Sequence, residues 1–219
     1  MTTRTPLRRD LTDLKQKVYS LGEKCIEVSE LYNSLLENYS NNLKDRLTAI
    51  SQEVKKESKD LNDQCFLVLT LQQPLIKDLR LVVGSLQIVL SFEKITEQYL
   101  STLSLLGDVN ILEESIKIQF ITMAKKVQEL IKTALTLYLS ANINHSDEAL
   151  KKFSEISCTH DILYKHILKE VGEKSGHPAQ IEAQLLATIR SLEKVSDLTI
   201  NIIEQVKYII VGKSESSNI

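Results

Sequence analysis

The chain has 219 residues, of which 27 are Lys or Arg and 29 are Asp or Glu, giving a formal net charge of -2. A near-neutral chain without an extended basic cluster lacks the electrostatic footprint of a nucleic-acid-binding protein, so we expect no DNA or RNA partner. Hydrophobic residues make up 42%, which favours a folded core over wholesale disorder. The 6 glycines and 3 prolines are too few for the many tight turns of a β-hairpin protein. This composition predicts an all-α chain.

Apolar runs in the chain are short or interrupted. The longer ones, such as residues 65–71 and 81–92, fall below the roughly eighteen residues that indicate a membrane-spanning helix. Residues 1–10 lead into a charged segment rather than an apolar one, so we expect no secretory signal. Cys25, Cys65 and Cys158 are widely spaced and odd in number, which suits reduced thiols better than a disulfide framework. We therefore expect a cytoplasmic protein without membrane insertion.

Apolar residues recur at steps of three and four along six segments, and sparse glycine, proline and asparagine residues separate them. In chain order, the expected helices span roughly residues 6–35, 43–73, 74–106, 110–141, 146–172 and 179–211. Gly107 suits the C-terminus of the third helix and divides the six segments into two sets of three.

A repeated motif shows that the two sets are related. Residues 91–97 (SFEKITE) align with residues 191–197 (SLEKVSD), one hundred positions later, and the apolar phase is kept on both sides. A fixed offset between similar segments indicates one unit used twice. The sequence therefore predicts two tandem three-helix bundles, residues 1–107 and 108–219, each ending in a helix that carries the motif.

Each motif holds two acids at positions i and i+4, which project from one helix face a single turn apart. The pairs are Glu93 with Glu97 and Glu193 with Asp197. Like charges at this spacing repel each other and destabilise the helix slightly. A bound cation is one explanation for the presence of such a pair in both repeats. Carboxylate oxygens suit ions such as Mg²⁺ or Mn²⁺, and helical bundles also hold iron or zinc between facing helices.

Other interpretations of the acid pairs stay open. A solvated charged face with local ion pairs gives a similar pattern, as does an adaptor protein that uses its acids for solubility and helix register. A di-metal enzyme would need Glu-x-x-His pairs, which are absent. His160 and His166 form no established zinc spacing, and no nucleophile motif or phosphate-binding glycine loop occurs. We expect a protein without enzymatic activity.

Further motifs resemble those of the PhoU family of bacterial phosphate-uptake regulators. Two three-helix units, each ending in a Glu-Lys-Ile/Val motif, are similar to the family over essentially the whole chain. Residues 73–80 (QPLIKDLR) resemble the family's Gln-Pro-x-x-x-Asp-Leu-Arg, and residues 197–204 (DLTINIIE) resemble its Asp-x-x-x-Asn-Ile-Ala-Glu. Leu21 and Gly22 stand where Met-Gly is typical of the family.

The resemblance implies a pseudo-twofold pair of bundles whose acid motifs hold metal ions. It also implies a regulator that restrains phosphate uptake and starvation signalling by contacting the ATPase of the phosphate ABC transporter and a sensor histidine kinase, with a homodimer as a further expectation. The implied metal ligands are Glu93, Glu97, Asp161, Glu193 and Asp197, Asp161 because residues 161–164 resemble the end of a family Asp-x-x-x-Asp segment. The resemblance leaves the identity of the metal open among Mg, Mn, Fe and Zn.

The first repeat departs from the family pattern. Where the second predicted helix should carry an acidic pair, Ser51 and Lys55 occur, and Glu97 replaces the usual Asp. Ser157 likewise replaces the first Asp in the fifth helix. A lysine ammonium beside the first motif could neutralise its carboxylates without metal. We therefore expect metal mainly in the second bundle.

Overall fold

The computed structural model describes residues 5–106, 114–144, 146–173 and 177–212. In this part of the chain every regular element is a helix, which confirms the all-α prediction. The helices are α1 (Thr5–Glu37), α2 (Asn41–Gln72), α3 (Lys77–Thr102), α4 (Glu114–Ser140), α5 (Ser146–Glu173) and α6 (His177–Val211). None of them combines the length and the apolar character that crossing a bilayer requires.

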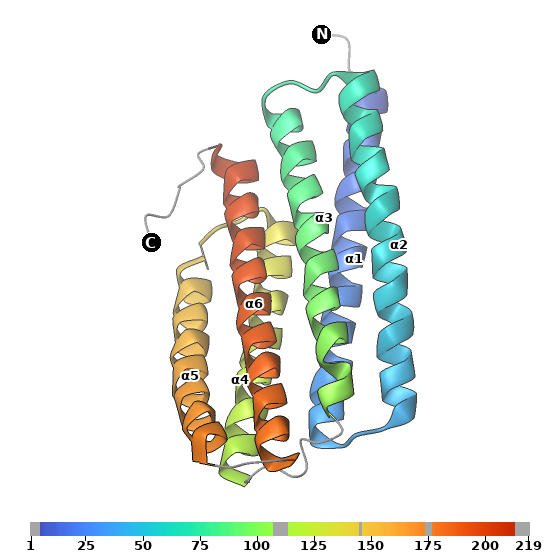
Figure 1. The fold of residues 1–219 in the computed structure, drawn as a ribbon. Helices are drawn as coiled ribbons and strands as arrows, with labels where there is room; N and C mark the ends of the chain where they lie inside the picture. Colours follow the sequence, from blue (N-terminus) through green and yellow to red (C-terminus); the bar gives the residue numbers. More distant parts are fainter. Residues whose placement is uncertain (1–4, 107–113, 145, 174–176, 213–219) are drawn as a thin grey trace.

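The six helices form two neighbouring three-helix bundles, α1–α3 and α4–α6, as the repeat predicted (Figure 1). The bundles meet where α3 packs against α6 and α1 packs against α4. Their buried side chains form one continuous core of mainly Leu, Ile and Val. The expected boundary between residues 107 and 108 lies outside the described residues, and the division into two domains stays a prediction.

Two glycines allow helices to approach closely inside this core. A Cβ atom on Gly22 of α1 would lie 2.5 Å from Cδ1 of Leu135 in α4 and 2.9 Å from Cζ of Phe92 in α3. A Cβ atom on Gly84 of α3 would lie 2.5 Å from Cγ1 of Ile209 in α6. Because both contacts involve the other bundle, the glycines determine how tightly the two halves pack.

The internal repeat has two different offsets. Lys24 of α1 pairs with Glu53 of α2, and Lys126 of α4 pairs with Glu155 of α5, so the first two helices of each half correspond at an offset of 102. The buried positions of α2 and α5 agree, since Val54 matches Ile156 at the same offset. The motifs of α3 and α6 differ by one hundred. The stretch from the paired glutamate of the second helix to the motif of the third helix is therefore two residues longer in the first half.

Candidate functional site

The acid motifs lie in the C-terminal half of α3 and near the middle of α6, and part of each motif has a packing role. Ile95 and Val195 are fully buried, as are Thr96 and Ser196. The Thr96 hydroxyl donates a hydrogen bond of 2.8 Å to the backbone carbonyl of Glu93, and the Ser196 hydroxyl makes the same bond of 2.7 Å to that of Glu193. The apolar and hydroxyl positions of the motif thus form its inward face, and the acids form its outward face.

In the first half, a lysine of α2 faces the acids of α3. Lys55 Nζ lies 3.4 Å from Glu97 Oε1, and both side chains are largely exposed. Burial raises the pKa of Glu93, and the adjacent Glu97 carboxylate adds to the rise, whereas Lys55 and Lys94 oppose it. The charge of Lys55 therefore acts on both carboxylates of the pair, as the sequence had suggested for a nearby lysine.

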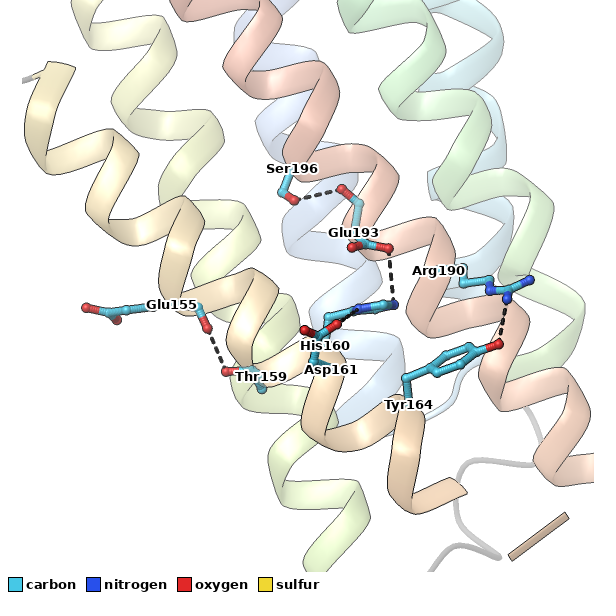
Figure 2. A network of polar contacts seen from close by, with 8 residues as sticks. All are labelled: Glu155, Thr159, His160, Asp161, Tyr164, Arg190, Glu193 and Ser196. Carbon is cyan, nitrogen blue, oxygen red and sulfur yellow. Dashed lines mark hydrogen bonds and ion pairs between the residues drawn. The ribbon is translucent and has the colours of Figure 1, made fainter. Parts of the chain in front are cut away.

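In the second half, a buried histidine of the second helix faces the motif in place of a lysine. His160 of α5 is 7% exposed and points toward α6 (Figure 2). Its Nε2 lies 3.1 Å from Glu193 Oε2, and its Nδ1 lies 3.2 Å from Asp161 Oδ1. The Nε2 contact is a close polar approach rather than an aligned hydrogen bond, because this atom has no hydrogen-bond partner among the described residues. The imidazole thus separates two predicted metal ligands.

Two further side chains hold the histidine ring in place. The ring of Tyr164 stacks on His160 with centroids 5.6 Å apart. Arg190 of α6 donates a hydrogen bond to the Tyr164 hydroxyl, and its guanidinium carbon lies 4.9 Å from the centre of that ring (Figure 2). An aromatic ring between an imidazole and a guanidinium gives a fixed connection between α5 and α6.

The five predicted ligands do not come together in one site. Asp161 and Glu193 meet on opposite nitrogens of His160. Asp197 makes no hydrogen bond or ion pair with any described residue, and Glu93 and Glu97 belong to the other bundle. Among the described residues, no group of three or more His, Cys, Asp or Glu side chains is placed to hold a metal ion.

As placed, these residues do not fit a metal ion. In the first half an ammonium group occupies the position beside the acids, and in the second half an imidazole ring stands between the two carboxylates. A hard cation needs several converging oxygen ligands, which neither arrangement supplies. The metal sites that the resemblance implied thus stay a prediction.

His160 is the residue whose importance the sequence did not reveal. The resemblance points to its neighbour Asp161 instead, because a single histidine in a helix is usually an ordinary surface or core residue. Its partner Glu193 lies on a different helix, and no fixed spacing in the sequence indicates such a contact. The usable signal was its position, since His160 falls on the apolar stripe of α5 with buried Ile156 and Leu163.

The chain is similar to phosphate-transport proteins over its whole length. Residues 18–100 match the PhoU domain family model. A phosphate-specific transport system accessory protein PhoU homolog of Clostridium acetobutylicum is 22% identical over 99% of both chains. A homolog of the same description from Synechocystis is 24% identical, with 97% of this chain and 94% of that protein covered.

The fold also matches solved structures whose sequences are about as distant as those of these relatives. The crystal structure of the phosphate transport system regulatory protein PhoU from Streptococcus pneumoniae superposes with a TM-score of 0.81 at 19% identity, covering 95% of this chain and 98% of that one. PhoU from Pseudomonas aeruginosa gives the same TM-score at 18% identity, with 94% and 99% covered. The domain match, the whole-length relatives and the shared fold confirm the resemblance to the PhoU family that was found in the sequence.

Proposed function

We propose that this protein is a cytoplasmic, non-enzymatic regulator of phosphate uptake and phosphate-starvation signalling. It acts by contact with the ATPase subunit of the phosphate ABC transporter and with a sensor histidine kinase. The observation that carries this proposal is the match, along 99% of both chains, to a phosphate-specific transport system accessory protein homolog. The fold adds support, because long helices give extended surfaces for partner proteins.

A surface suited to such contact lies at the connection between α2 and α3. Six large apolar side chains that are at least 40% exposed lie in this connection and in the adjoining ends of α2 and α3: Phe66, Leu67, Leu71, Leu75, Ile76 and Leu79. We call this set the apolar tip; it stands beyond the end of α6 in Figure 1. Large apolar side chains left exposed close together in the chain are typical of interaction sites. We assign the apolar tip to the transporter ATPase subunit.

The backbone of the apolar tip supports this assignment. Ile76 has φ 39° and ψ -91°, a conformation that a β-branched residue rarely adopts, and its side chain is 76% exposed. Gln73, with φ 45°, is also in the left-handed region. Strained backbone persists only where the surrounding structure imposes it, and it is concentrated at functional sites. Here it holds a large apolar side chain in solvent, where a partner can bury it.

A second candidate function is that of a structural adaptor whose acid motifs bind no metal. The observation that favours it is that one acid of each motif already has a polar partner, Glu97 in Lys55 and Glu193 in His160. Elemental analysis after dialysis, comparing wild type with a Glu193→Ala/Asp197→Ala variant, separates the two. Stoichiometric metal that is lost in the variant supports a metal-dependent regulator, and its absence from both proteins supports the adaptor. Size-exclusion chromatography with light scattering tests the predicted homodimer.

Binding to the transporter ATPase subunit tests the main proposal. We expect wild type to retain the purified ATPase subunit in a pull-down, and Leu71→Ser/Ile76→Ser to lose at least about tenfold in affinity because two apolar anchors are removed. The control is Leu139→Ser/Leu150→Ser, which removes two other exposed leucines, 52% and 42% exposed, from helices away from the tip. If wild type does not bind, or if both variants bind equally, the contact is not made by the apolar tip.

A cellular readout tests the regulatory role separately. In a strain that lacks its own copy of the gene, wild type should repress a phosphate-starvation reporter in phosphate-rich medium. The Leu71→Ser/Ile76→Ser variant should leave the reporter derepressed, and the Leu139→Ser/Leu150→Ser control should restore repression. A reporter that responds identically with and without the wild-type gene would show that phosphate signalling is not its pathway.

A further inference from the structure

Lys55 stands where its charge meets both acids of the first motif. It projects from α2 toward α3, with its ammonium 3.4 Å from Glu97 and its charge also lowering the raised pKa of Glu93. An ammonium in contact with a carboxylate opposes the approach of a metal ion in two ways. It repels the ion, and it occupies a position from which an oxygen ligand would have to come.

The second half shows what this position looks like without the lysine. At the offset of 102 that relates α2 to α5, the counterpart of Lys55 is Ser157, which is neutral and half-buried. Glu97 corresponds to Asp197, which has no cationic partner among the described residues. The two halves thus differ in charge at the position that, in the first half, faces the second acid of the motif.

The other charged groups near the first motif do not take the place of Lys55 and do not add oxygen ligands to the acid pair. Lys94 lies in α3 itself and is exposed. On α2, the neighbouring Lys56 is exposed and makes no ion pair within the described part of the chain. Glu53 and Glu57 of α2 face α1, where both bind Lys24 at 2.7 Å, so they are not available to add oxygens to Glu93 and Glu97.

We propose that Lys55 takes the place of a metal ion at the first acid pair, so that α2 and α3 are joined there by the chain's own ammonium group. The first motif therefore binds no divalent cation, although it keeps the acid spacing of the second. Lys55 supplies the positive charge beside the first acid pair, and exchanging it for a carboxylate converts the pair into a three-carboxylate site.

Binding of Mn²⁺ to the metal-free protein tests this proposal. Wild type, Lys55→Glu and Lys56→Glu are stripped with a chelator, and free Mn²⁺ is then measured by electron paramagnetic resonance. Lys55→Glu should gain one site with at least about tenfold higher affinity than wild type, because ligand charge sets the affinity of such sites. The Lys56→Glu control makes the same charge change on the neighbouring residue and should gain none.

Two further variants keep the test decisive. Adding Glu93→Gln/Glu97→Gln to Lys55→Glu should abolish the gained site and leave any binding elsewhere unchanged. Lys55→Ser, which introduces the residue of the second half, serves if the glutamate variant does not fold, and it should bind Mn²⁺ more tightly than wild type. The proposal is overturned if the wild-type protein loses a Mn²⁺ site in Glu93→Gln/Glu97→Gln. It is equally overturned if Lys55→Glu gains no more than Lys56→Glu.

Discussion

The two halves of this protein share their packing and differ in their polar contacts. Both place the same motif on the third helix, with its apolar and hydroxyl residues buried, and both join their first two helices by a lysine–glutamate pair at corresponding positions. Between the second and third helices, however, the first half uses exposed Lys55 and the second uses buried His160. The packing residues of a duplicated bundle are constrained by the core, whereas the groups around its acids can diverge.

This difference distinguishes two groups of residues that recur in both motifs, those required by packing and the acids on the outward face. The Ile/Val and Thr/Ser positions recur because they fill the same space and satisfy the same helix carbonyl in each half. The acids recur on the outward face, where packing does not require them. Their retention beside different partners, an ammonium in one half and an imidazole in the other, is consistent with a charge role that each half fulfils in its own way.

The largest effect is expected where the packing itself differs between the halves. Gly22 of α1 corresponds to Ala124 of α4, and only the glycine position lacks room for a Cβ atom. Gly22→Val should lower the free energy of unfolding by about 3 kcal/mol, because the added carbons meet Leu135 and Phe92 in a filled core. Urea denaturation monitored by circular dichroism measures it.

The reciprocal variant is the control for this prediction. Ala124→Gly removes one methyl group and should cost about 1 kcal/mol, mainly through lost helix propensity. Equal costs for Gly22→Val and Ala124→Gly would show that the close approach of α1 to α4 is not a constraint on the fold.

A smaller effect is expected at the buried polar position of the second helix. Ser58 of α2 and His160 of α5 correspond at the offset of 102, and both are buried. His160→Ala should cost about 2 kcal/mol, since it leaves a cavity beside Tyr164 and removes the contact with Glu193. Chemical denaturation at neutral pH provides the measurement.

Ser58→Ala is the matched comparison. The Ser58 hydroxyl is buried without a hydrogen-bond partner in the part of the chain that the structure describes, so removing it should change stability by less than about 0.5 kcal/mol. If His160→Ala were as mild as Ser58→Ala, the histidine would be a passive core residue. The contrast between the two motif sites would then rest on Lys55 alone.

Most of the fold could be predicted from the sequence, because helix periodicity, sparse glycine and proline residues and the repeated motif all pointed to the same architecture. The predicted ends of the second and sixth helices agree with Gln72 and Val211 to within one residue. The third helix begins at Lys77 rather than Pro74, because the connection before it adopts left-handed and strained backbone at Gln73 and Ile76. Such backbone depends on tertiary contacts and is not determined by local sequence.

The candidate site was less predictable than the fold. Acid spacing along one helix fixes which face Glu193 and Asp197 share, but not what the neighbouring helix brings to that face. The contacts of Lys55 and His160 depend on the register between helices, and the two offsets of 102 and one hundred show that this register cannot be taken from the motif alone. For the same reason the sequence could not show that the five predicted ligands do not form one cluster, and their role in metal binding stays a prediction.

The smallest expected effect compares the corresponding ion pairs of the two halves. Lys24 contacts both Glu53 and Glu57 at 2.7 Å, whereas the ion pair of Lys126 among the described residues is with Glu155, at 3.0 Å. The hydrogen bond from Lys24 holds the pKa of Glu53 below its ordinary value, and that from Lys126 does the same for Glu155. A glutamate with a lowered pKa stabilises the fold above its unfolded pKa of about 4.3, and this contribution is lost as the pH falls through the folded pKa.

Lys24→Met should therefore be less stable than wild type at pH 7, with the difference shrinking below about pH 4, and Lys126→Met should show the same trend more weakly. Urea midpoints from pH 3 to 7 measure both, with exposed Lys56→Met as the control. A loss that is independent of pH, or one that is larger for Lys126→Met, would mean that the lysine stems act through packing rather than charge.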